Sequence, residues 1–265
     1  VQGTMDEICE KLEGAISGTE FTIVNVLDIP TPNIVREKKE KHSEFKAKLI
    51  ILKNDYYTEM LTSFGNKYLA AGFLRLGFFQ NSKGTQVVIT DPETINRIIF
   101  NDLEETKYNE VIKKTIPFKE ELVSLLHSAE ISEKTGTALE PIRSDLFIKK
   151  GKKDMPMMVG KMTFFQKESQ FPIVYSEQNT TVADVKAKLM SNIKNFQPST
   201  DDAKYHYTED RENLIWEVVS EITSPDSSAI LLGIMRDRTT ALSFHIAGMK
   251  RETDENASPG IDHVC

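Results

Sequence analysis

The run FTIVNVLDI, residues 21–29, is dominated by β-branched and aliphatic side chains and predicts a strand. On its C-terminal side, FKAKLIILKND at 45–55 predicts a second strand, and YYTEMLTSFGNKYLAA at 56–71 predicts a helix. Two apolar runs, 73–79 and 85–90, flank Asn-Ser-Lys-Gly and predict a hairpin, because glycine tolerates the positive φ that such turns need. This order of elements predicts an α+β domain.

The residues that follow the hairpin, Asp91-Pro92-Glu93, predict the start of a helix. Asp91 suits the N-cap, where its carboxylate can accept a hydrogen bond from a free backbone N–H. Pro92 suits the first helical position, because the N–H that proline lacks has no partner to lose there. The helix is expected to run to about Asn101.

Two further helices are predicted in the first half of the chain. Apolar residues recur at spacings of three and four over 5–16, and Thr4 and Glu7 occupy the positions of a capping box. A periodic run over 109–127 predicts another helix, interrupted near Pro117 because proline lacks the N–H that a helix interior uses.

The second half begins after a polar stretch, 128–144, which has no hydrophobic period and predicts a linker. A helix is predicted over 181–195 with Thr181 as its cap, and a shorter helix over 214–222. Strands are predicted over 145–150, 156–166, 171–175, 204–208, 229–236 and 241–248. The chain is therefore expected to be α+β with two domains, each a mainly antiparallel sheet packed against helices. Their expected bounds are 1–127 and 145–249, with a polar tail over 250–265.

Composition narrows the classes of function. The chain has 265 residues, a net charge of -7 and a pI near 5.4, which disfavours nucleic acid as its partner. No apolar run approaches the roughly 20 residues that a transmembrane helix needs. Two cysteines, Cys9 and Cys265, are too few and too poorly placed for a disulfide framework or a zinc site. No cofactor and no metal ion are expected.

Motifs that would mark a catalytic centre are missing from the sequence. It has no Gly-rich phosphate loop, zinc-binding HExxH, nucleophile elbow or EF-hand loop. The last of five histidines lies in Asp262-His263-Val264-Cys265, and a chain end is a poor place to preorganise a metal site. The lysines of 149–153 and the mixed charges of 36–42 indicate solvated surface. The sequence therefore leans away from an enzyme.

The element order over residues 1–127, together with the Asp-Pro-Glu turn at 91–93, resembles a prokaryotic family described only as domain of unknown function 302. The resemblance implies a fold and no reaction. In that family a cysteine-containing segment close to GACNP follows the strand that corresponds to 45–52. In this chain Lys53, Asn54 and Asp55 stand in that place, and a second cysteine near the hairpin is replaced within LRLGFFQ. A ligand or reaction that depends on those thiols is therefore not carried over.

The later helix permits two interpretations. TVADVKAKLMSNI at 181–193 repeats the capping threonine, the apolar positions and the Lys-Leu pair of TMDEICEKLEGAI at 4–16. The repeat suits a duplicated module, although any capped amphipathic helix shares the pattern. Residues 161–189 also resemble the opening strand, turn, strand and helix of a ubiquitin-like β-grasp domain, which implies a topology and no functional motif.

We expect a non-catalytic protein that binds a protein partner or a second copy of itself, because sheets of this kind leave edge strands available. A chain that begins at Val1 is expected to be either an exported chain whose leader has been removed or a fragment, and an extracytoplasmic location is slightly preferred to a cytoplasmic one. One alternative is a small-molecule-binding enzyme or cofactor carrier that uses residues 53–79, whose aromatic side chains are otherwise expected to fill the core. Its ligand-binding residues would be Lys53, Asn54, Asp55, Tyr56 and Tyr57. Another alternative is a ubiquitin-like adaptor module over 158–248.

Overall fold

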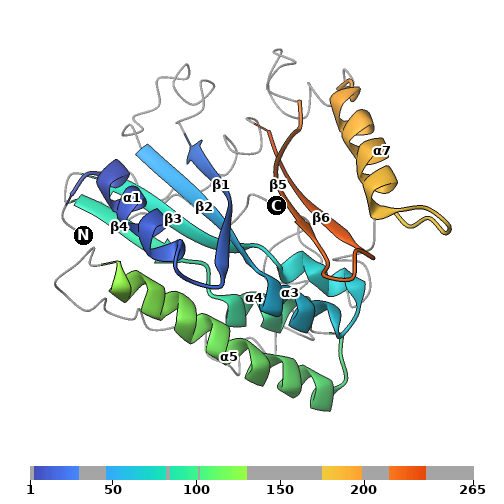
Figure 1. The fold of residues 1–265 in the computed structure, drawn as a ribbon, viewed down its shortest axis with the longest axis horizontal. Coiled ribbons are helices and arrows are strands. Elements are labelled where there is room, and N and C mark those ends of the chain that lie inside the picture. Colours follow the sequence, from blue (N-terminus) through green and yellow to red (C-terminus); the bar gives the residue numbers. More distant parts are fainter. Residues whose placement is uncertain are drawn as a thin grey trace, which may run out of the picture.

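The computed structural model describes residues 3–29, 46–81, 84–100, 102–129, 175–198 and 215–236. The elements are α1 (Met5–Ile16), β1 (Phe21–Ile29), β2 (Lys46–Asn54), α3 (Asp55–Thr62), the 3-10 helix η1 (Asn66–Ala71), β3 (Leu74–Asn81), β4 (Gly84–Ile89), α4 (Pro92–Ile99), α5 (Glu105–Ser128), α7 (Val182–Lys194), β5 (Glu217–Thr223) and β6 (Ile230–Met235). Helices and antiparallel sheets occur together, which confirms the predicted α+β class (Figure 1).

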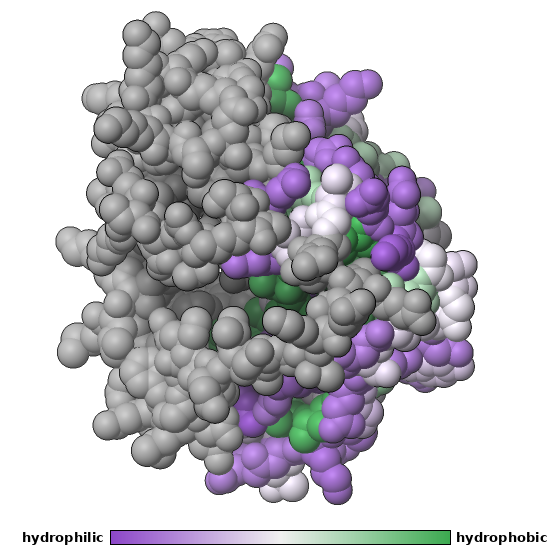
Figure 2. Space-filling model, turned by 90° about the vertical axis from the view of Figure 1, so that its left-hand side faces the viewer, coloured by the Kyte–Doolittle hydropathy of each residue, from purple (hydrophilic) through white to green (hydrophobic). Residues whose placement is uncertain are grey.

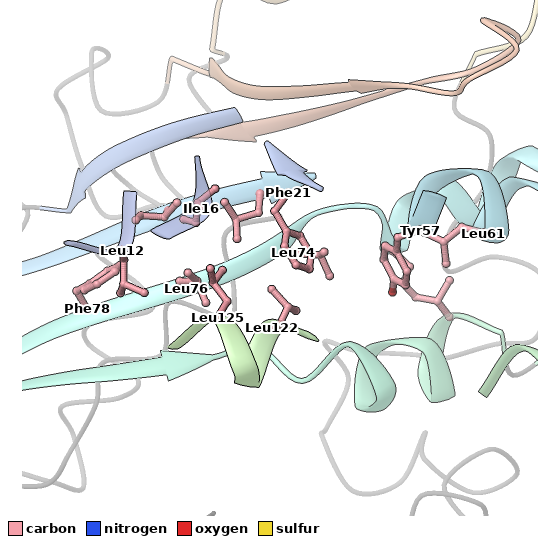
Figure 3. Close-up of a cluster of buried hydrophobic side chains, with 14 of the residues drawn as sticks. Leu12, Ile16, Phe21, Tyr57, Leu61, Leu74, Leu76, Phe78, Leu122 and Leu125 are labelled. Atoms are coloured by element: carbon pink, nitrogen blue, oxygen red, sulfur yellow. The ribbon is translucent and has the colours of Figure 1, made fainter. Parts of the chain in front are cut away.

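A four-stranded antiparallel sheet, β1-β2-β3-β4, forms the centre of the fold. α1 and α5 pack against one of its faces, and their apolar residues join those of β2 and β3 in a continuous inner cluster. Figure 3 shows this packing between the sheet and α5, with Leu12, Leu76 and Leu125 among the contacting side chains. Each fully buried side chain of this size contributes roughly 1.5–3 kcal/mol.

Local signals in the sequence place several helix starts correctly. The side-chain oxygen of Thr4 accepts from the backbone N–H of Glu7, and Glu7 accepts in return from Thr4, which is the predicted capping box of α1. Thr181 caps α7 in the same way. Asp91 caps α4 with Pro92 in its first turn, and the helix ends at Ile99, two residues before the predicted end.

The helix predicted over 56–71 is in fact two helices. α3 ends at Thr62 and η1 begins at Asn66. Between them Gly65 has φ 130°, a conformation that side-chain-bearing residues rarely adopt and that interrupts the α-helical path. The change of direction allows Tyr68 and Leu69 of η1 to be buried.

The interruption predicted near Pro117 is wrong, because α5 runs without a break from Glu105 to Ser128 with Pro117 inside it. A proline in a helix interior costs roughly 3 kcal/mol. Burial on both sides of the proline offsets this cost: Tyr108, Val111 and Ile112 are buried before it, and Leu122 and Leu125 after it.

The helix predicted over 214–222 is also wrong, since residues 217–223 form strand β5. Its partner β6 confirms the strand predicted over 229–236. Val218, Val219 and Thr223 are β-branched and favour a strand, and pairing with β6 decides the outcome. The spacing of apolar residues alone cannot distinguish a short helix from a short strand.

The β5–β6 hairpin lies on the opposite side of the sheet from α5 (Figure 3). Met235 of β6 packs against an outer cluster on that face, whose buried members are Ile29, Ala47, Leu49, Ile51 and Phe79. Both faces of the four-stranded sheet are therefore apolar, and segments distant in sequence contact them.

β1 and β5 share an irregularity near their starts. The register of β1 with β2 shifts between Ile23 and Asn25, and that of β5 with β6 shifts between Val218 and Ser220. Each shift places one extra residue in the strand, as in a β-bulge, and leaves a backbone group without its ladder partner.

Several predicted features lie outside the described residues. They are the connector 36–42, the lysines of 149–153, the strands over 145–150, 156–166, 204–208 and 241–248, the tail over 250–265 and nearly all of 171–175, of which Tyr175 alone is described and lies in no strand. The division into domains at 128–144 stays a prediction.

Candidate functional site

The candidate ligand-binding residues lie where β2 ends and α3 begins. Asn54 is the last residue of β2 and caps α3, because its side-chain oxygen accepts from the backbone N–H of Tyr57 at 2.9 Å. The carbonyl of Asn54 accepts from the hydroxyl of Thr58, also at 2.9 Å. Asn54 is buried, so its side chain is committed to holding the helix start.

Lys53, Asp55 and Tyr56 reach the surface at the same junction. The ammonium of Lys53 lies 3.0 Å from the carboxylate of Asp55. An ion pair as exposed as this one contributes about 0–1 kcal/mol, so both groups remain available to another ligand. Tyr56 exposes 62% of its surface. Three of the five candidate residues are therefore accessible from the surface.

Tyr57 points into the core and belongs to a buried chain of hydrogen bonds. Its hydroxyl donates to the side-chain oxygen of Asn96 at 3.1 Å, and the amide nitrogen of Asn96 donates to Thr115 at 2.7 Å. The hydroxyl of Thr115 donates to the carbonyl of Val111 at 2.8 Å. Burial raises the pKa of Tyr57 well above its ordinary value, so its hydroxyl stays protonated and joins α3, α4 and α5.

The other aromatic residues of 56–79 mostly fill the core, as expected. Tyr68 and Phe78 are buried in the inner cluster, Phe79 is buried in the outer cluster, and Phe64 and Phe73 pack against these clusters. Tyr56 is the exception. The aromatic segment therefore contributes mainly to packing.

A group of charges surrounds the Asp-Pro-Glu turn. The guanidinium of Arg97 lies 2.6 Å from the carboxylate of Glu93, and the ammonium of Lys119 lies 3.0 Å from Glu93 and 3.1 Å from Asp91. Burial alone would raise the pKa of Glu93, but hydrogen bonds from Arg97 and Lys119 outweigh it and lower that pKa. The turn is thereby fastened to α5.

A second mixed cluster forms around η1. The hydroxyl of Tyr68 donates to the carboxylate of Asp102 at 2.8 Å, and Lys67 also pairs with Asp102. The ring of Tyr68 stacks on Phe100 with 4.2 Å between centroids. Burial, followed by the bond to Asp102, raises the pKa of Tyr68, so this hydroxyl also remains a donor.

Cys9 lies within α1 and is buried. Its thiol donates to the carboxylate of Glu13 at 3.3 Å. Burial and this bond raise the pKa of Cys9 to about 12, so the thiol is protonated at neutral pH and is a poor nucleophile.

The described residues contain no group of three or more His, Cys, Asp or Glu residues that could hold a metal ion. No helix among them is long and apolar enough to cross a membrane. The Asp-His-Val-Cys sequence at 262–265 lies outside the described residues, as do residues 161–174 of the segment that resembles a β-grasp domain.

Hydrophobic side chains at the surface indicate where a partner could bind, which no sequence motif does. Those that are large and exposed are Tyr56, Ile116, Val123, Met190, Phe196 and Ile215. Met190 lies on α7, the helix that repeats the pattern of α1, and Phe196 lies just beyond its end. These two exposed side chains form the apolar rim of α7. On the side of the molecule seen in Figure 2, hydrophilic and hydrophobic described residues are mixed.

No protein-family model and no curated protein matches this sequence. Among solved structures, the chain is similar to the crystal structure of an uncharacterized conserved protein, DUF302, from Bacillus stearothermophilus. The two are 14% identical, the match covers 49% of this chain and 94% of that one, and the TM-score is 0.39. A similarity of this extent assigns neither a family to the chain nor a role to any residue.

Proposed function

We propose that this chain is a non-catalytic binding protein that associates with a second copy of itself through the surface of α7. The observation that supports the proposal is the apolar rim of α7, formed by Met190 and by Phe196 just beyond the helix end. The net charge of -7 favours a protein partner over nucleic acid.

The contrast between α7 and α1 is the main support. Both helices start with a threonine capping box and repeat apolar residues at helical spacing. α1 buries five side chains, whereas none of the residues of α7, all of which are described, is buried. Figure 1 draws α7 beyond the hairpin, at the edge of the molecule. An amphipathic helix covered this incompletely is suited to a partner.

The ion pair between Lys186 and Glu221 of β5, 2.6 Å apart, marks the side of α7 that faces the hairpin. The stripe of Val182, Val185, Leu189 and Ile193 is half-buried. Met190 is 38% exposed and Phe196 is 37% exposed. Complete burial of such side chains stabilises a complex by roughly 1.5–3 kcal/mol each before the costs of association.

Light scattering on a dilution series tests the proposal. We expect the parent chain to have a mass above that of the monomer and to dissociate on dilution, and the variant Met190→Lys/Phe196→Lys to be monomeric. The matched control is Ile116→Lys/Val123→Lys, which adds the same charge at α5 residues that are each 40% exposed. A parent chain that is monomeric at every concentration would refute self-association. Equal behaviour of both variants would refute the role of α7.

A second candidate function is small-molecule binding at the β2–α3 junction. The observation that favours it is the ion pair of Lys53 with Asp55 at the surface, next in sequence to the exposed ring of Tyr56. Native mass spectrometry of protein purified without denaturation is the test. A retained small molecule that is lost in Lys53→Ala/Tyr56→Ala would favour this function, and a bare parent chain would oppose it.

A further inference from the structure

The β5–β6 hairpin is anchored to β1 and η1 by hydrogen bonds at two separate points. The side-chain amide of Asn25 in β1 donates to the carbonyl of Val219 in β5 at 2.5 Å. Near the turn of the hairpin, the side-chain amide of Asn66 in η1 donates to the hydroxyl of Ser228 at 3.0 Å. Asn66 and Ser228 are both exposed, so water competes for the second bond and its net contribution to stability is modest.

The apolar contacts of the hairpin with the rest of the chain are local. Ile222 of β5 is buried, and its terminal carbon lies 3.5 Å from the position of a Cβ added at Gly72. A ring carbon of Phe73 lies 3.4 Å from the corresponding position at Gly233 of β6, and Met235 packs against the outer cluster. All six residues of β6 are half-buried, so docking removes only part of their surface from water.

The inner cluster does not depend on the hairpin or on α7. Its described members, both buried and partly buried, all come from residues 5–129. Within α7, β5 and β6 the buried residues are Ser220 and Ile222 alone. The main apolar core of the described chain therefore stays intact if these three elements leave the sheet.

α7, β5 and β6 are also joined to one another. β5 pairs with β6 from Glu217 to Met235, and Lys186 of α7 lies 2.6 Å from Glu221 of β5. A two-stranded hairpin is at best marginally stable in water by itself, so the order of β5 and β6 depends on docking. Regions with few buried apolar contacts open at a lower free energy than the core, in contiguous cooperative units.

We propose that α7, β5 and β6 form a strap that leaves the outer face of the sheet as one unit while the four-stranded sheet and the inner cluster stay folded. In the closed state the strap lies over Gly72, Phe73 and the part of the outer cluster that Met235 contacts (Figure 3). Opening exposes this apolar surface to solvent. The strap therefore controls access to the outer sheet face, and this role goes beyond the proposed association through α7 and does not depend on it.

Native-state hydrogen exchange tests the strap in the full-length chain, with mass spectrometry of peptides and urea below the global transition. Dilute protein is used, so that association through α7 adds no protection. Residues 217–223 and 230–235 should exchange through an opening at least about ten-fold more frequent than the one that exposes residues 49–52 and 74–78. Equal frequencies would refute the strap. Distinct openings for β5, β6 and α7 would refute its movement as one unit.

Removal of the anchor near the hairpin turn gives a second test. Asn66→Ala deletes the bond to Ser228, so exchange over 217–235 should become several-fold faster while exchange over 49–52 stays unchanged. The matched control is Asn109→Ala, which removes the same amide from an exposed position of α5 and should change neither region. Equal acceleration of both regions in Asn66→Ala, or no acceleration over 217–235, would refute the strap.

Discussion

The hydroxyl of Tyr57 donates a hydrogen bond to the side-chain oxygen of Asn96 across 3.1 Å of the protein interior. Both residues are completely buried, and they belong to different helices, α3 and α4. Tyr57 was predicted to bind a ligand from its position beside Lys53, but a hydrogen bond from its hydroxyl to a ligand would have to replace the bond to Asn96. The direction of the side chain therefore separates Tyr57 from its exposed neighbour Tyr56, although the two are adjacent in sequence.

Replacing Tyr57 with Phe should lower the free energy of unfolding by about 1–3 kcal/mol, because Asn96 loses the donor to its buried oxygen. Urea denaturation measures the change. Tyr56→Phe is the matched control, since it removes the same atom from a side chain that is 62% exposed and should change stability by less than about 0.5 kcal/mol. Equal effects would show that the buried bond contributes nothing.

Removing the side chain of Asn54 should cost about 1 kcal/mol, because Asn54→Ala leaves the N–H of Tyr57 without its cap. Asn54→Asp retains an acceptor and should recover most of the loss. Thermal unfolding of the three proteins checks this order. If Ala and Asp variants were equally destabilised, the packing of Asn54 rather than its cap would be the dominant contribution.

Two glycine substitutions should act in opposite directions. Gly14→Ala lies within α1 where an added Cβ meets nothing within 4 Å, so it should stabilise the protein by about 0.5–1 kcal/mol. Gly233→Ala would bring its Cβ to 2.0 Å from the hydroxyl of Ser220, and it should destabilise the protein by about 1–3 kcal/mol.

Ser220→Ala provides the control for the second substitution. It removes the clashing oxygen, so Gly233→Ala should cost less in the Ser220→Ala background than in the parent chain. Denaturation of the four proteins in this cycle gives the coupling. An unchanged cost would mean that the strain at Gly233 arises elsewhere.

Glu93 and Glu121 should respond oppositely to acid. The pKa of Glu93 is lowered from 4.5, so its contribution to stability is present above that value and is lost as pH falls through the folded-state pKa. Glu93→Gln should therefore destabilise the protein at pH 7 and make no difference in strong acid. The pKa of Glu121 is raised by burial and by the charge of Glu20. Glu121→Gln should accordingly stabilise the protein at pH 7 and lose this advantage as pH falls.

Melting temperature measured from pH 7 to pH 2.5 distinguishes the two carboxylates. The melting temperature of Glu93→Gln should lie below that of the parent chain at pH 7, and the difference should shrink as pH falls. The melting temperature of Glu121→Gln should lie above that of the parent chain at pH 7 and approach it as pH falls. If the difference in melting temperature between either variant and the parent chain did not change with pH, the assigned direction of the pKa shift of that carboxylate would be wrong.

The thiol of Cys9 should resist iodoacetamide at pH 8 in the native protein, because it is buried and its pKa is about 12. Mass spectrometry of peptides gives the extent of labelling. The same residue should be fully labelled in denaturant, which serves as the internal control. Rapid native labelling of Cys9 would mean that α1 opens readily from the sheet.

Short-range signals in the sequence are enough to predict much of the fold. Thr4 with Glu7, and Asp91 with Pro92, act on their own helix starts within three residues, so their effect does not depend on distant parts of the chain. The continuity of α5 through Pro117 could not be predicted in this way, because it depends on burial against other elements. β5 could not be predicted as a strand without knowledge of its pairing with β6.

The candidate site shows the same limit. The sequence places Lys53, Asn54, Asp55, Tyr56 and Tyr57 together, but it does not say which side chains face inward. A strand end followed at once by a helix start sends Asn54 and Tyr57 into the interior and leaves Lys53, Asp55 and Tyr56 outside. The partnership of Lys119 with Asp91 and Glu93 joins residues 26–28 positions apart, for which the sequence carries no local sign.

The irregular start of β1 also bears on aggregation. Among the described strands β1 lies at an edge of the four-stranded sheet, and a flat, regular edge would be a template for adding strands from other molecules. The extra residue near Val24 disturbs the regular spacing there, and the amide of Asn25 is already bonded to Val219. The bulge and the bonded amide therefore make this edge a poorer template for fibril growth than a flat, regular strand would be.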